Sequence, residues 1–471
     1  MFIETLPVAI IGGGPVGLAA AAHLIARNVP VKLYEAGSTV GASMREWGHV
    51  RVFTPWRYCV DEMAAALLAR HGWHRPPADV FPTGGEIVAH YLEPLAAVPA
   101  LARAIETGAR VTAVSRHGLD KVVSRGRAER PFVVTVEAPG GRRRDLARAI
   151  IDASGTWRTP NPLGASGIAV QGEAAFAGRI AYGIPDVAGR ERDLFAGAST
   201  LVVGAGHSAA NVLLDLARLA EAEPSTSILW ATRGRDLSRV YGGGSADRLP
   251  ARGELGAETR RLVASGRVAL ATGFAITGLH EEAGRLVVTG ETADGQRRLG
   301  PIDRIVVATG QRPDLSLTRE LRLDLDPWLE SARALGPLID PNVHSCGSVP
   351  PHGHRELSHP EPGFYTVGIK SYGRAPTFLL LTGYEQVRSV AAALAGDMAA
   401  ADDVHLVLPE TGVCTTQVAG TTQTAAGCCG GPAPEDVEAC CVADAEARQS
   451  GRAGCGCGAQ GSAARSAVLD A

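Results

Sequence analysis

The sequence predicts an α/β fold of two doubly wound halves, one inserted into the other, followed by a cysteine-rich tail. Two glycine-rich turns, at residues 12–17 and 204–209, lie about 190 residues apart, and each follows an aliphatic, strand-like run. The tripeptide Ala-Ser-Gly at 153–155 recurs as Ala-Thr-Gly at 308–310, again after an aliphatic run. Seven of the nine cysteines fall in the last sixty residues. Repeated strand–turn–helix units are typical of parallel α/β sheets, and the cysteines mark the tail as a separate segment.

Composition places the chain among ordinary globular proteins. It has 471 residues, of which 45% are hydrophobic and 20% charged, with a net charge of −3. This charge gives no reason to expect nucleic acid or an anionic membrane as a partner. The most apolar stretch, 8–22, is interrupted by glycines and a proline and has no basic region before it. It therefore predicts a buried strand, turn and helix rather than a membrane span or signal peptide, and we expect a cytoplasmic protein.

The expected elements follow from the apolar runs, read in chain order. Short β-branched runs predict strands, and longer alanine- and leucine-rich stretches predict helices. The expected strands are 8–11, 31–34, 110–114, 131–137, 149–155, 201–203, 228–231, 305–310 and 364–368, and the expected helices are 15–26, 61–70, 84–95, 208–220 and 379–394. Arg142, Arg143 and Arg144 are expected in a solvated hairpin turn. The expected domains are residues 1–158 and 306–400 for the first half, 159–305 for the inserted half and 401–471 for the tail.

The first glycine turn has the residues that a dinucleotide pyrophosphate requires. Gly12 permits a sharp bend, Gly14 lets the backbone approach the pyrophosphate, and Gly17 lets the helix pack closely on the strand. The helix begins at Pro15, and its N-terminus favours negative charge. Glu35, eighteen residues beyond Gly17, is placed to accept from both hydroxyls of an adenosine ribose. A carboxylate there repels a 2′-phosphate, so this turn fits FAD or NAD rather than NADP.

The second turn has a different specificity. It contains Gly204 and Gly206, and Ala209 replaces the third glycine while still allowing close packing. The strand that follows ends without a carboxylate and is succeeded by Arg233 and Arg235. A guanidinium binds a phosphate through paired, charge-assisted hydrogen bonds. We therefore expect NADPH rather than NADH here, the alternative being that both arginines are solvated loop charges.

This order of motifs resembles the two-dinucleotide-binding flavoproteins, and most of all the flavin-containing and Baeyer–Villiger monooxygenases. Phe-Pro-Thr at 81–83 and Ala-Ser-Gly-Thr-Trp at 153–157 support the resemblance, which covers about residues 5–395. It implies FAD and NADPH as cofactors, with the second domain inserted into the first. Beyond the residues of the two turns already named, the expected cofactor-binding residues are Arg45, Trp47, Val111, Ser154, Gly155, Ser208, Thr309, Gly310 and Gly368.

Two segments depart from the patterns of these families. Residues 176–182 resemble the monooxygenase fingerprint, but Ile180 or Ala181 stands where its histidine is expected. Related disulfide reductases end their FAD domain with a Gly-Asp pair whose carboxylate binds the ribityl chain. Here Gly368 is kept without the acid, so we expect flavin contacts from backbone or from Lys370 and its neighbours. This stretch is similar to flavoproteins encoded beside arsenic-resistance genes, which share a cysteine-rich end.

The cysteines and histidines suggest further sites. Cys59 and Cys346 each stand alone, which excludes a paired-dithiol mechanism within residues 1–400. Neighbouring thiolates in the tail can chelate soft ions such as As(III), Hg(II) or Cu(I), although the tail is too polar to order without a ligand. The expected ligands are Cys428, Cys429, Cys440, Cys441, Cys455 and Cys457, the alternative being an idle tail. Three further side chains could bind metal or line a substrate pocket, but without a fourth ligand ordinary polar loop residues are favoured: His352, His354 and His359.

The leading functional interpretation is an enzyme in which NADPH reduces FAD and the reduced flavin activates dioxygen to oxygenate a small soft nucleophile. A trivalent arsenical is the candidate substrate. Two alternatives stay open: an NADPH-dependent reductase or oxidase without oxygenation, and a thiophilic-metalloid-binding protein on a flavoprotein scaffold. The sequence identifies no catalytic side chain. It also leaves the oligomeric state open, with a homodimer as one alternative.

Overall fold

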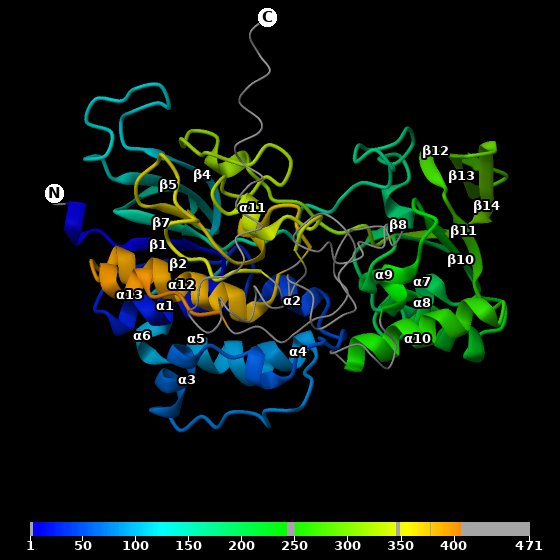
Figure 1. Ribbon diagram of the computed structural model, residues 1–471, viewed down its shortest axis with the longest axis horizontal. Coiled ribbons are helices and arrows are strands. Elements are labelled where there is room, and N and C mark those ends of the chain that lie inside the picture. The colour runs from blue at the N-terminus through cyan, green and yellow to red at the C-terminus, as the bar shows by residue number, and fades with distance from the viewer. Residues whose placement is uncertain (1–2, 243–249, 345–348, 377, 407–471) are drawn as a thin grey trace, which may run out of the picture. The chain divides into compact units, whose positions relative to one another are not determined.

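Two parallel sheets organise the structure, a computed structural model that describes residues 3–242, 250–344, 349–376 and 378–406 (Figure 1). Within these residues each sheet has five strands, in the orders β16-β7-β1-β2-β3 and β11-β10-β9-β15-β8. All neighbouring strands in both sheets are parallel. The first sheet receives its last strand, β16, after the whole second sheet has been formed along the chain. This arrangement confirms the predicted α/β fold.

The strands are short and largely buried. Those of the first sheet are β1 (Val8–Ile11), β2 (Val31–Tyr34), β3 (Ile105–Glu106), β7 (Ala149–Asp152) and β16 (Phe364–Thr366). Those of the second are β8 (Ile180–Tyr182), β9 (Ser199–Val203), β10 (Ser227–Thr232), β11 (Ala269–Thr272) and β15 (Arg304–Val307). The predicted domain boundary at 305/306 falls inside β15, which belongs to the second sheet.

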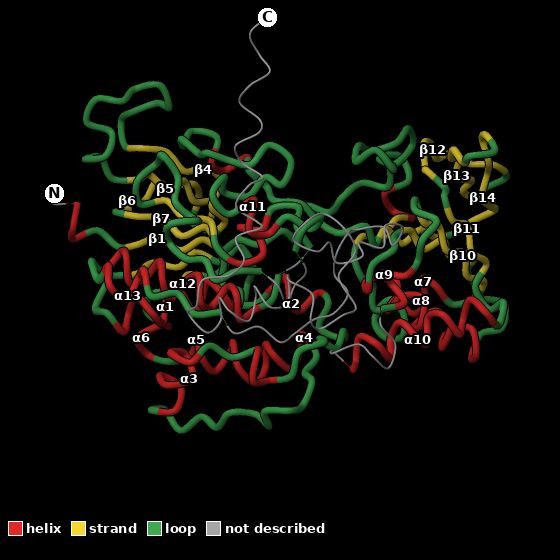
Figure 2. The backbone as a smooth tube through the Cα atoms, in the orientation of Figure 1, coloured by secondary structure: helices red, strands yellow, loops and turns green. Residues whose placement is uncertain are grey.

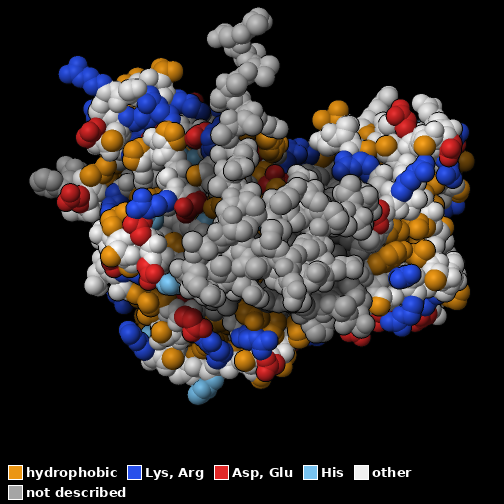
Figure 3. All heavy atoms as spheres, in the orientation of Figure 1, with side chains coloured by type: hydrophobic (Ala, Val, Ile, Leu, Met, Phe, Trp, Pro, Cys, Tyr) orange, Lys and Arg blue, Asp and Glu red, His pale blue; other side chains and the backbone are white. Residues whose placement is uncertain are grey.

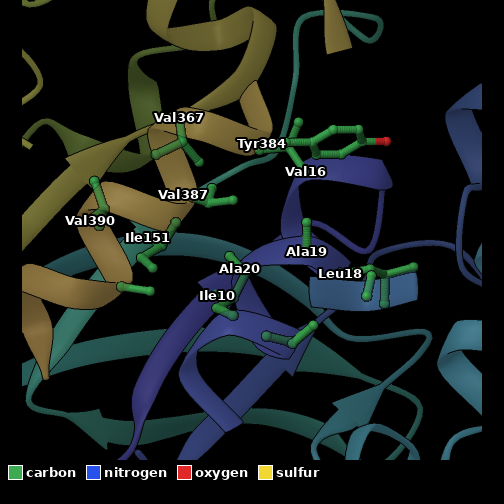
Figure 4. Close-up of a cluster of buried hydrophobic side chains, with 14 of the residues drawn as sticks. Ile10, Val16, Leu18, Ala19, Ala20, Ile151, Val367, Tyr384, Val387 and Val390 are labelled. Carbon is green, nitrogen blue, oxygen red and sulfur yellow. The ribbon is translucent and has the colours of Figure 1, made fainter. Parts of the chain in front are cut away.

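Helices cover one face of the first sheet. The apolar side chains of α1 (Pro15–Ala26) pack on Ile10 of β1, while α12 (Leu380–Leu394) contributes Tyr384, Val387 and Val390 to the same cluster (Figure 4). The cluster also includes side chains of the shorter helices α3 (Glu62–Ala69), α5 (Glu93–Ala97), α6 (Pro99–Ala102) and α11 (Gly336–Ile339). The wall behind the first glycine turn is therefore completed by a helix some 370 residues later.

Each parallel sheet carries a three-stranded antiparallel sheet on its other face. On the first sheet this layer is β4 (Arg110–Arg116), β5 (Phe132–Ala138) and β6 (Gly141–Ala147), seen beside β7 and β1 in Figure 2. On the second it is β12 (Ala275–Glu282), β13 (Arg285–Thr292) and β14 (Gly295–Ile302). The opposite face of the second sheet packs against α8 (His207–Ala222) and α10 (Pro250–Ala264). Alternate side chains of each strand thus enter different cores.

The remaining elements are short. They are α2 (Ala42–Glu46), α4 (Gly84–Ile87), α7 (Arg192–Phe195), α9 (Ser238–Tyr241), α13 (Met398–Asp402), the π-helical η3 (Val88–Leu92), and the 3₁₀ segments η1 (Ile3–Thr5), η2 (Trp56–Tyr58), η4 (Ala177–Arg179), η6 (Ser316–Thr318) and η7 (Gly368–Tyr372). No helix among the described residues is long and apolar enough to cross a membrane. On the face shown in Figure 3, cationic and anionic side chains are interspersed over the described residues, as the near-neutral net charge leads one to expect.

The structure corrects the expectation that the three arginines lie in a turn. Arg142, Arg143 and Arg144 lie in β6, paired with Glu137, Val136 and Thr135 of β5. The strand is at the edge of its sheet, so charged side chains can face solvent without breaking the ladder. Arg143 also donates to Glu106 and Asp145.

Other expected boundaries shift as well. The single helix expected at 84–95 is divided by η3 and ends at Ala97. The strand expected at 364–368 ends at Thr366, because Gly368 adopts φ +69° and begins η7. The tail expected from 401 begins inside α13, where Ala401 is fully buried. The tail cysteines and Cys346 lie outside the described residues.

Candidate functional site

A single cavity of about 1510 Å³ is lined by both glycine turns. Its walls include the segments that follow β1, β2 and β7 in the first sheet and β9, β10 and β15 in the second. Ligands of open α/β sheets bind at this carboxyl edge of the strands. The volume exceeds the roughly 300–1,000 Å³ usual for a single small-molecule site. The cavity therefore has room for more than one ligand.

The first turn places one open glycine between two packed ones. A Cβ on Gly12, which has φ +104°, would lie 2.6 Å from the Ala153 carbonyl oxygen, and one on Gly17 would lie 2.0 Å from the Gly12 oxygen. A Cβ on Gly14 would meet no protein atom within 4 Å, and Gly14 lines the cavity with Pro15. Gly14 is also the N-cap of α1 and makes no side-chain cap, so the first-turn amides can receive an anion. This cradle fits a pyrophosphate.

The second turn repeats the arrangement. A Cβ on Gly204, at φ +136°, would lie 2.3 Å from the Ala308 carbonyl oxygen, whereas one on Gly206 would meet nothing within 4 Å. Gly206 is the N-cap of α8 and again makes no side-chain cap. Ser208 lines the cavity, while Ala209 is fully buried in the helix packing and does not. A second pyrophosphate fits here.

Glu35 is held rigidly at the end of β2. Its Oε2 accepts from the amide of Gly13 and its Oε1 from the amide of Gly37, both at 2.6 Å. The side chain is 9% exposed and lines the cavity. A carboxylate oxygen has two lone-pair directions, so each can accept a second hydrogen bond. The group therefore fits a ribose with two free hydroxyls and disfavours a phosphate at that point.

The two arginines after β10 have different surroundings. Arg233 lines the cavity, and its Nη1 donates to the Ala165 carbonyl at 2.7 Å, which leaves other N–H groups of the guanidinium for a ligand. Arg235 does not line the cavity and instead packs over Gly273. The expectation of a cofactor contact from Arg235 is therefore not met, because the bend after β10 directs the two side chains to different places.

The first half shows a similar separation at α2. Trp47 lines the cavity, and its ring centroid lies 6.4 Å from that of Trp157. Arg45 does not line the cavity and forms an ion pair with Glu93. The ion pair with Glu93 holds the Arg45 side chain away from the cavity that Trp47 lines. The expected cofactor contact from Arg45 is not met.

The remaining predicted residues line the cavity, with one correction at the end of the first half. Those that line it are Val111, Ser154, Gly155, Thr309, Gly310 and Gly368. Lys370 does not. Its Nζ donates to Asp152 Oδ2 at 2.7 Å and to Ser154 Oγ at 3.0 Å, and the side chain is buried. Of the contacts expected from backbone or from Lys370 and its neighbours, the Lys370 side chain lies outside the cavity lining, whereas Gly368 and Ile369 line it.

Several cavity residues were not identified from the sequence. The loop at 161–167 contributes much of one wall, and Asn161 donates from Nδ2 to the Thr309 carbonyl at 2.9 Å. Further aromatic and cationic side chains complete the lining, one of them from α10 (Arg252) and the others from loops, namely Arg51, Phe53, Trp157, Arg158, Arg374 and Phe378. Apart from Trp157, which ends the Ala-Ser-Gly-Thr-Trp motif, none of these belongs to a spaced motif. Residues 45–57 are rich in aromatic and basic side chains, and this composition could have indicated Arg51 and Phe53.

Cys59 and the three histidines at 352, 354 and 359 lie outside the cavity lining. Cys59 is fully buried, and burial raises the pKa of its thiol to about 11. His352 contacts the Pro350 carbonyl and Gln386, His354 contacts Asp402, and His359 accepts from the backbone amide of residue 324. No group of three or more potential metal ligands is found among the described residues. Each of these three histidines thus has a polar partner within the fold.

Comparisons with known proteins agree with this geometry. Residues 7–85 match the family model described as FAD dependent oxidoreductase, which covers the first turn and Glu35. No curated protein sequence matches. Among solved structures, the chain is similar to a bacillithiol disulfide reductase from Bacillus cereus (18% identity, 83% of this chain and 99% of that one, TM-score 0.61).

Two monooxygenases are also similar in fold. The ornithine N-hydroxylase of Kutzneria sp. 744, described with reduced FAD, NADP⁺ and L-ornithine, has 17% identity over 84% of this chain and 98% of that one, with a TM-score of 0.54. A flavin-containing monooxygenase from Stenotrophomonas maltophilia has 21% identity over 83% and 98%, with a TM-score of 0.52. Residues 7–85 are thus similar to the FAD dependent oxidoreductase family, and the chain shares its fold with both reductases and monooxygenases.

Proposed function

We propose that this chain is an NADPH-dependent, FAD-containing oxidoreductase of the monooxygenase type that oxygenates a small soft nucleophile. The observation that carries the proposal is one cavity lined by two glycine turns, each with a glycine open to the cavity at an uncapped helix N-terminus. When bound, FAD would supply hydride acceptance from NADPH and two-electron activation of dioxygen.

The chain's own residues bind and orient the two dinucleotides. The α1 N-terminus and Gly14 receive the FAD pyrophosphate, and Glu35 accepts from the adenosine ribose. The α8 N-terminus and Gly206 receive the NADPH pyrophosphate. Arg233 binds the 2′-phosphate while its Nη1 stays on the Ala165 carbonyl. Both dinucleotides would then be held in one cavity, because both turns line it.

A reductase that passes electrons through its own thiols is disfavoured by the lining. Such a mechanism places a reactive thiolate beside the flavin. Cys59 is the one described cysteine, and it is buried, absent from the cavity wall and raised in pKa. Aromatic rings of Phe53, Trp157 and Phe378 instead provide apolar walls that exclude water from a reacting centre.

The substrate is proposed from the sequence alone. A trivalent arsenical is the first candidate, because the thiol-rich residues beyond 406 are suited to a thiophilic metalloid. The alternatives remain a flavin oxidase or reductase without oxygenation and a metalloid-binding protein on a flavoprotein scaffold.

The deciding experiment is anaerobic reduction of the purified holoprotein by NADPH, followed by rapid mixing with oxygenated buffer with and without arsenite. We expect NADPH to bleach the flavin absorbance and arsenate to appear in proportion to NADPH consumed. Hydrogen peroxide as the sole product, unaffected by arsenite, would support the oxidase alternative for this substrate. A flavin that NADPH does not reduce would contradict the proposed function itself.

A further inference from the structure

A buried ion pair lies directly behind the cavity wall of the first half. Lys370, in η7, and Asp152, the last residue of β7, are buried to 2% and 0% exposure and lie 2.7 Å apart. Burying two charges costs desolvation free energy, and an apolar pair of similar volume is often as stable. Fold stability alone therefore does not explain why this site is charged.

Ser154 joins this pair to the cavity. Its hydroxyl donates to Asp152 Oδ1 at 2.6 Å and accepts from Lys370 Nζ at 3.0 Å, while its backbone amide also donates to Asp152 Oδ1. Ser154 lines the cavity, as do Gly155 and Ile369 on either side of the pair. The ammonium group is thus separated from the first dinucleotide's part of the cavity by one hydroxyl.

The charge of Lys370 also acts on another wall residue. Asp314 lines the cavity, and its pKa lies below the ordinary value even though burial raises it. Hydrogen bonds from the Ser316 hydroxyl and amide lower the pKa, and the positive charge of Lys370 lowers it further. The field of the buried ammonium group therefore reaches a carboxylate that borders the cavity.

We infer that Lys370 and Asp152 are positioning residues that set the reduction potential of the flavin through Ser154, an inference that rests on the proposed FAD site. Reduction adds two electrons from the donor and one or two protons from water, so the reduced ring system carries more negative charge whenever only one proton follows. Lys370 favours that form and Asp152 opposes it. Where the acid after Gly368 is missing, the chain thus has the buried Lys370–Asp152 ion pair, which carries no net charge.

The test measures the midpoint potential of bound FAD by anaerobic dithionite titration with a reference dye, in the full-length holoprotein. Lys370→Met should lower the potential by about 30 mV or more, a tenfold change in the two-electron equilibrium. Asp152→Asn should raise it by a similar amount. Their double variant should return close to the wild-type value. Opposite shifts of the midpoint potential distinguish the two explanations. Simple loosening of the site would shift the potentials of both single variants in the same direction.

A control is available in a second buried ionic cluster, in which Glu361 is paired with both Arg116 and Arg127. Arg127 donates to Glu361 at 2.6 Å, both are buried, and neither lines the cavity. Arg127→Met should lower the melting temperature without moving the potential. If Lys370→Met does not fold, the comparison of Asp152→Asn with the double variant still isolates the lysine charge.

The inference is overturned if the Lys370 and Asp152 variants leave the potential unchanged, shift it in the same direction, or shift it no more than Arg127→Met does. Those outcomes leave the proposed function standing, provided that the wild-type protein holds FAD and is reduced by NADPH. A wild-type protein that purifies and folds without binding added FAD contradicts the proposed function instead.

Discussion

At the scale of single residues, the two open glycines are the most direct test of the dinucleotide sites. Gly14→Val would project a branched side chain into the space reserved for the FAD pyrophosphate, so we expect a folded protein with little bound flavin. The ratio of flavin to protein absorbance measures this. Gly178→Val is the control, because that glycine also has open space around it, has no positive φ and does not line the cavity. Full flavin content in Gly14→Val would show that the first turn does not bind the FAD pyrophosphate.

We expect Arg233 to determine the preference between the two nicotinamide cofactors. Arg233→Ala should raise the KM for NADPH by about tenfold, which corresponds to a charge-assisted hydrogen bond of about 1.5 kcal/mol, and should change the KM for NADH little. We use the low end of the range for charge-assisted hydrogen bonds because the Arg233 side chain is exposed. Arg235→Ala is the control, since Arg235 lies away from the cavity. An equal increase in KM for NADPH and NADH would show that Arg233 does not bind the 2′-phosphate.

At the scale of elements, the loop before β16 makes folding stability depend on pH. Burial lowers the pKa of His352 and of His359 below the ordinary value, so the folded state prefers both rings neutral. Below about pH 6.5 the unfolded chain therefore takes up protons that the folded chain does not. The stability from these rings is complete above that pH and is lost as the pH falls toward the folded pKa values.

Urea denaturation at pH 7.5 and 5.5 should show a smaller free energy of unfolding at the lower pH. In His352→Asn this pH-dependent difference should shrink, because one of the two rings is gone. A difference that is as large in His352→Asn as in the wild type would mean that His352 does not contribute. The variant His71→Asn serves as control, because His71 is exposed just after α3.

The elements that sequence alone could predict are those whose signal is local. The glycine turns, the flanking helices and Glu35 follow from residue type and spacing. A pyrophosphate is bound by backbone amides, and glycines at fixed positions are what give it access to them. The packing of Lys370 on Asp152 joins segments 218 residues apart, and no local pattern reports such a contact. The same holds for the 161–167 loop, for the strand nature of Arg142 to Arg144, and for the outward direction of Arg45.

At the scale of the whole molecule, the residues after 406 should be separable from flavin chemistry. Truncation after residue 406 should leave FAD content and NADPH-driven flavin reduction intact, since both turns lie upstream. It should abolish tight As(III) binding, because Cys59 is buried and Cys346 alone cannot chelate. Binding by the full chain should weaken at low pH, as thiols with a pKa of about 8.5 must lose protons to coordinate.

Isothermal titration with arsenite would compare the two chains. Undiminished binding by the truncated chain would place the ion elsewhere, and loss of NADPH reduction would make the tail part of the electron path. Truncation after residue 397 is a separate control for fold integrity. It removes α13, whose Asp402 pairs with His354 and Arg355, and should lower the melting temperature.

The late position of β16 and α12 in the chain has a consequence for biosynthesis. Residues 153–363 are translated between β7 and β16, which takes on the order of 10–40 s at about 5–20 residues per second. The second sheet is complete once β15 has emerged, well before that interval ends. Throughout it, the edge of β7 and the side of α1 that later meets α12 have no partner. The nascent FAD half therefore presents an open strand edge and an apolar helix face to chaperones, and it can accept its flavin only near the end of translation.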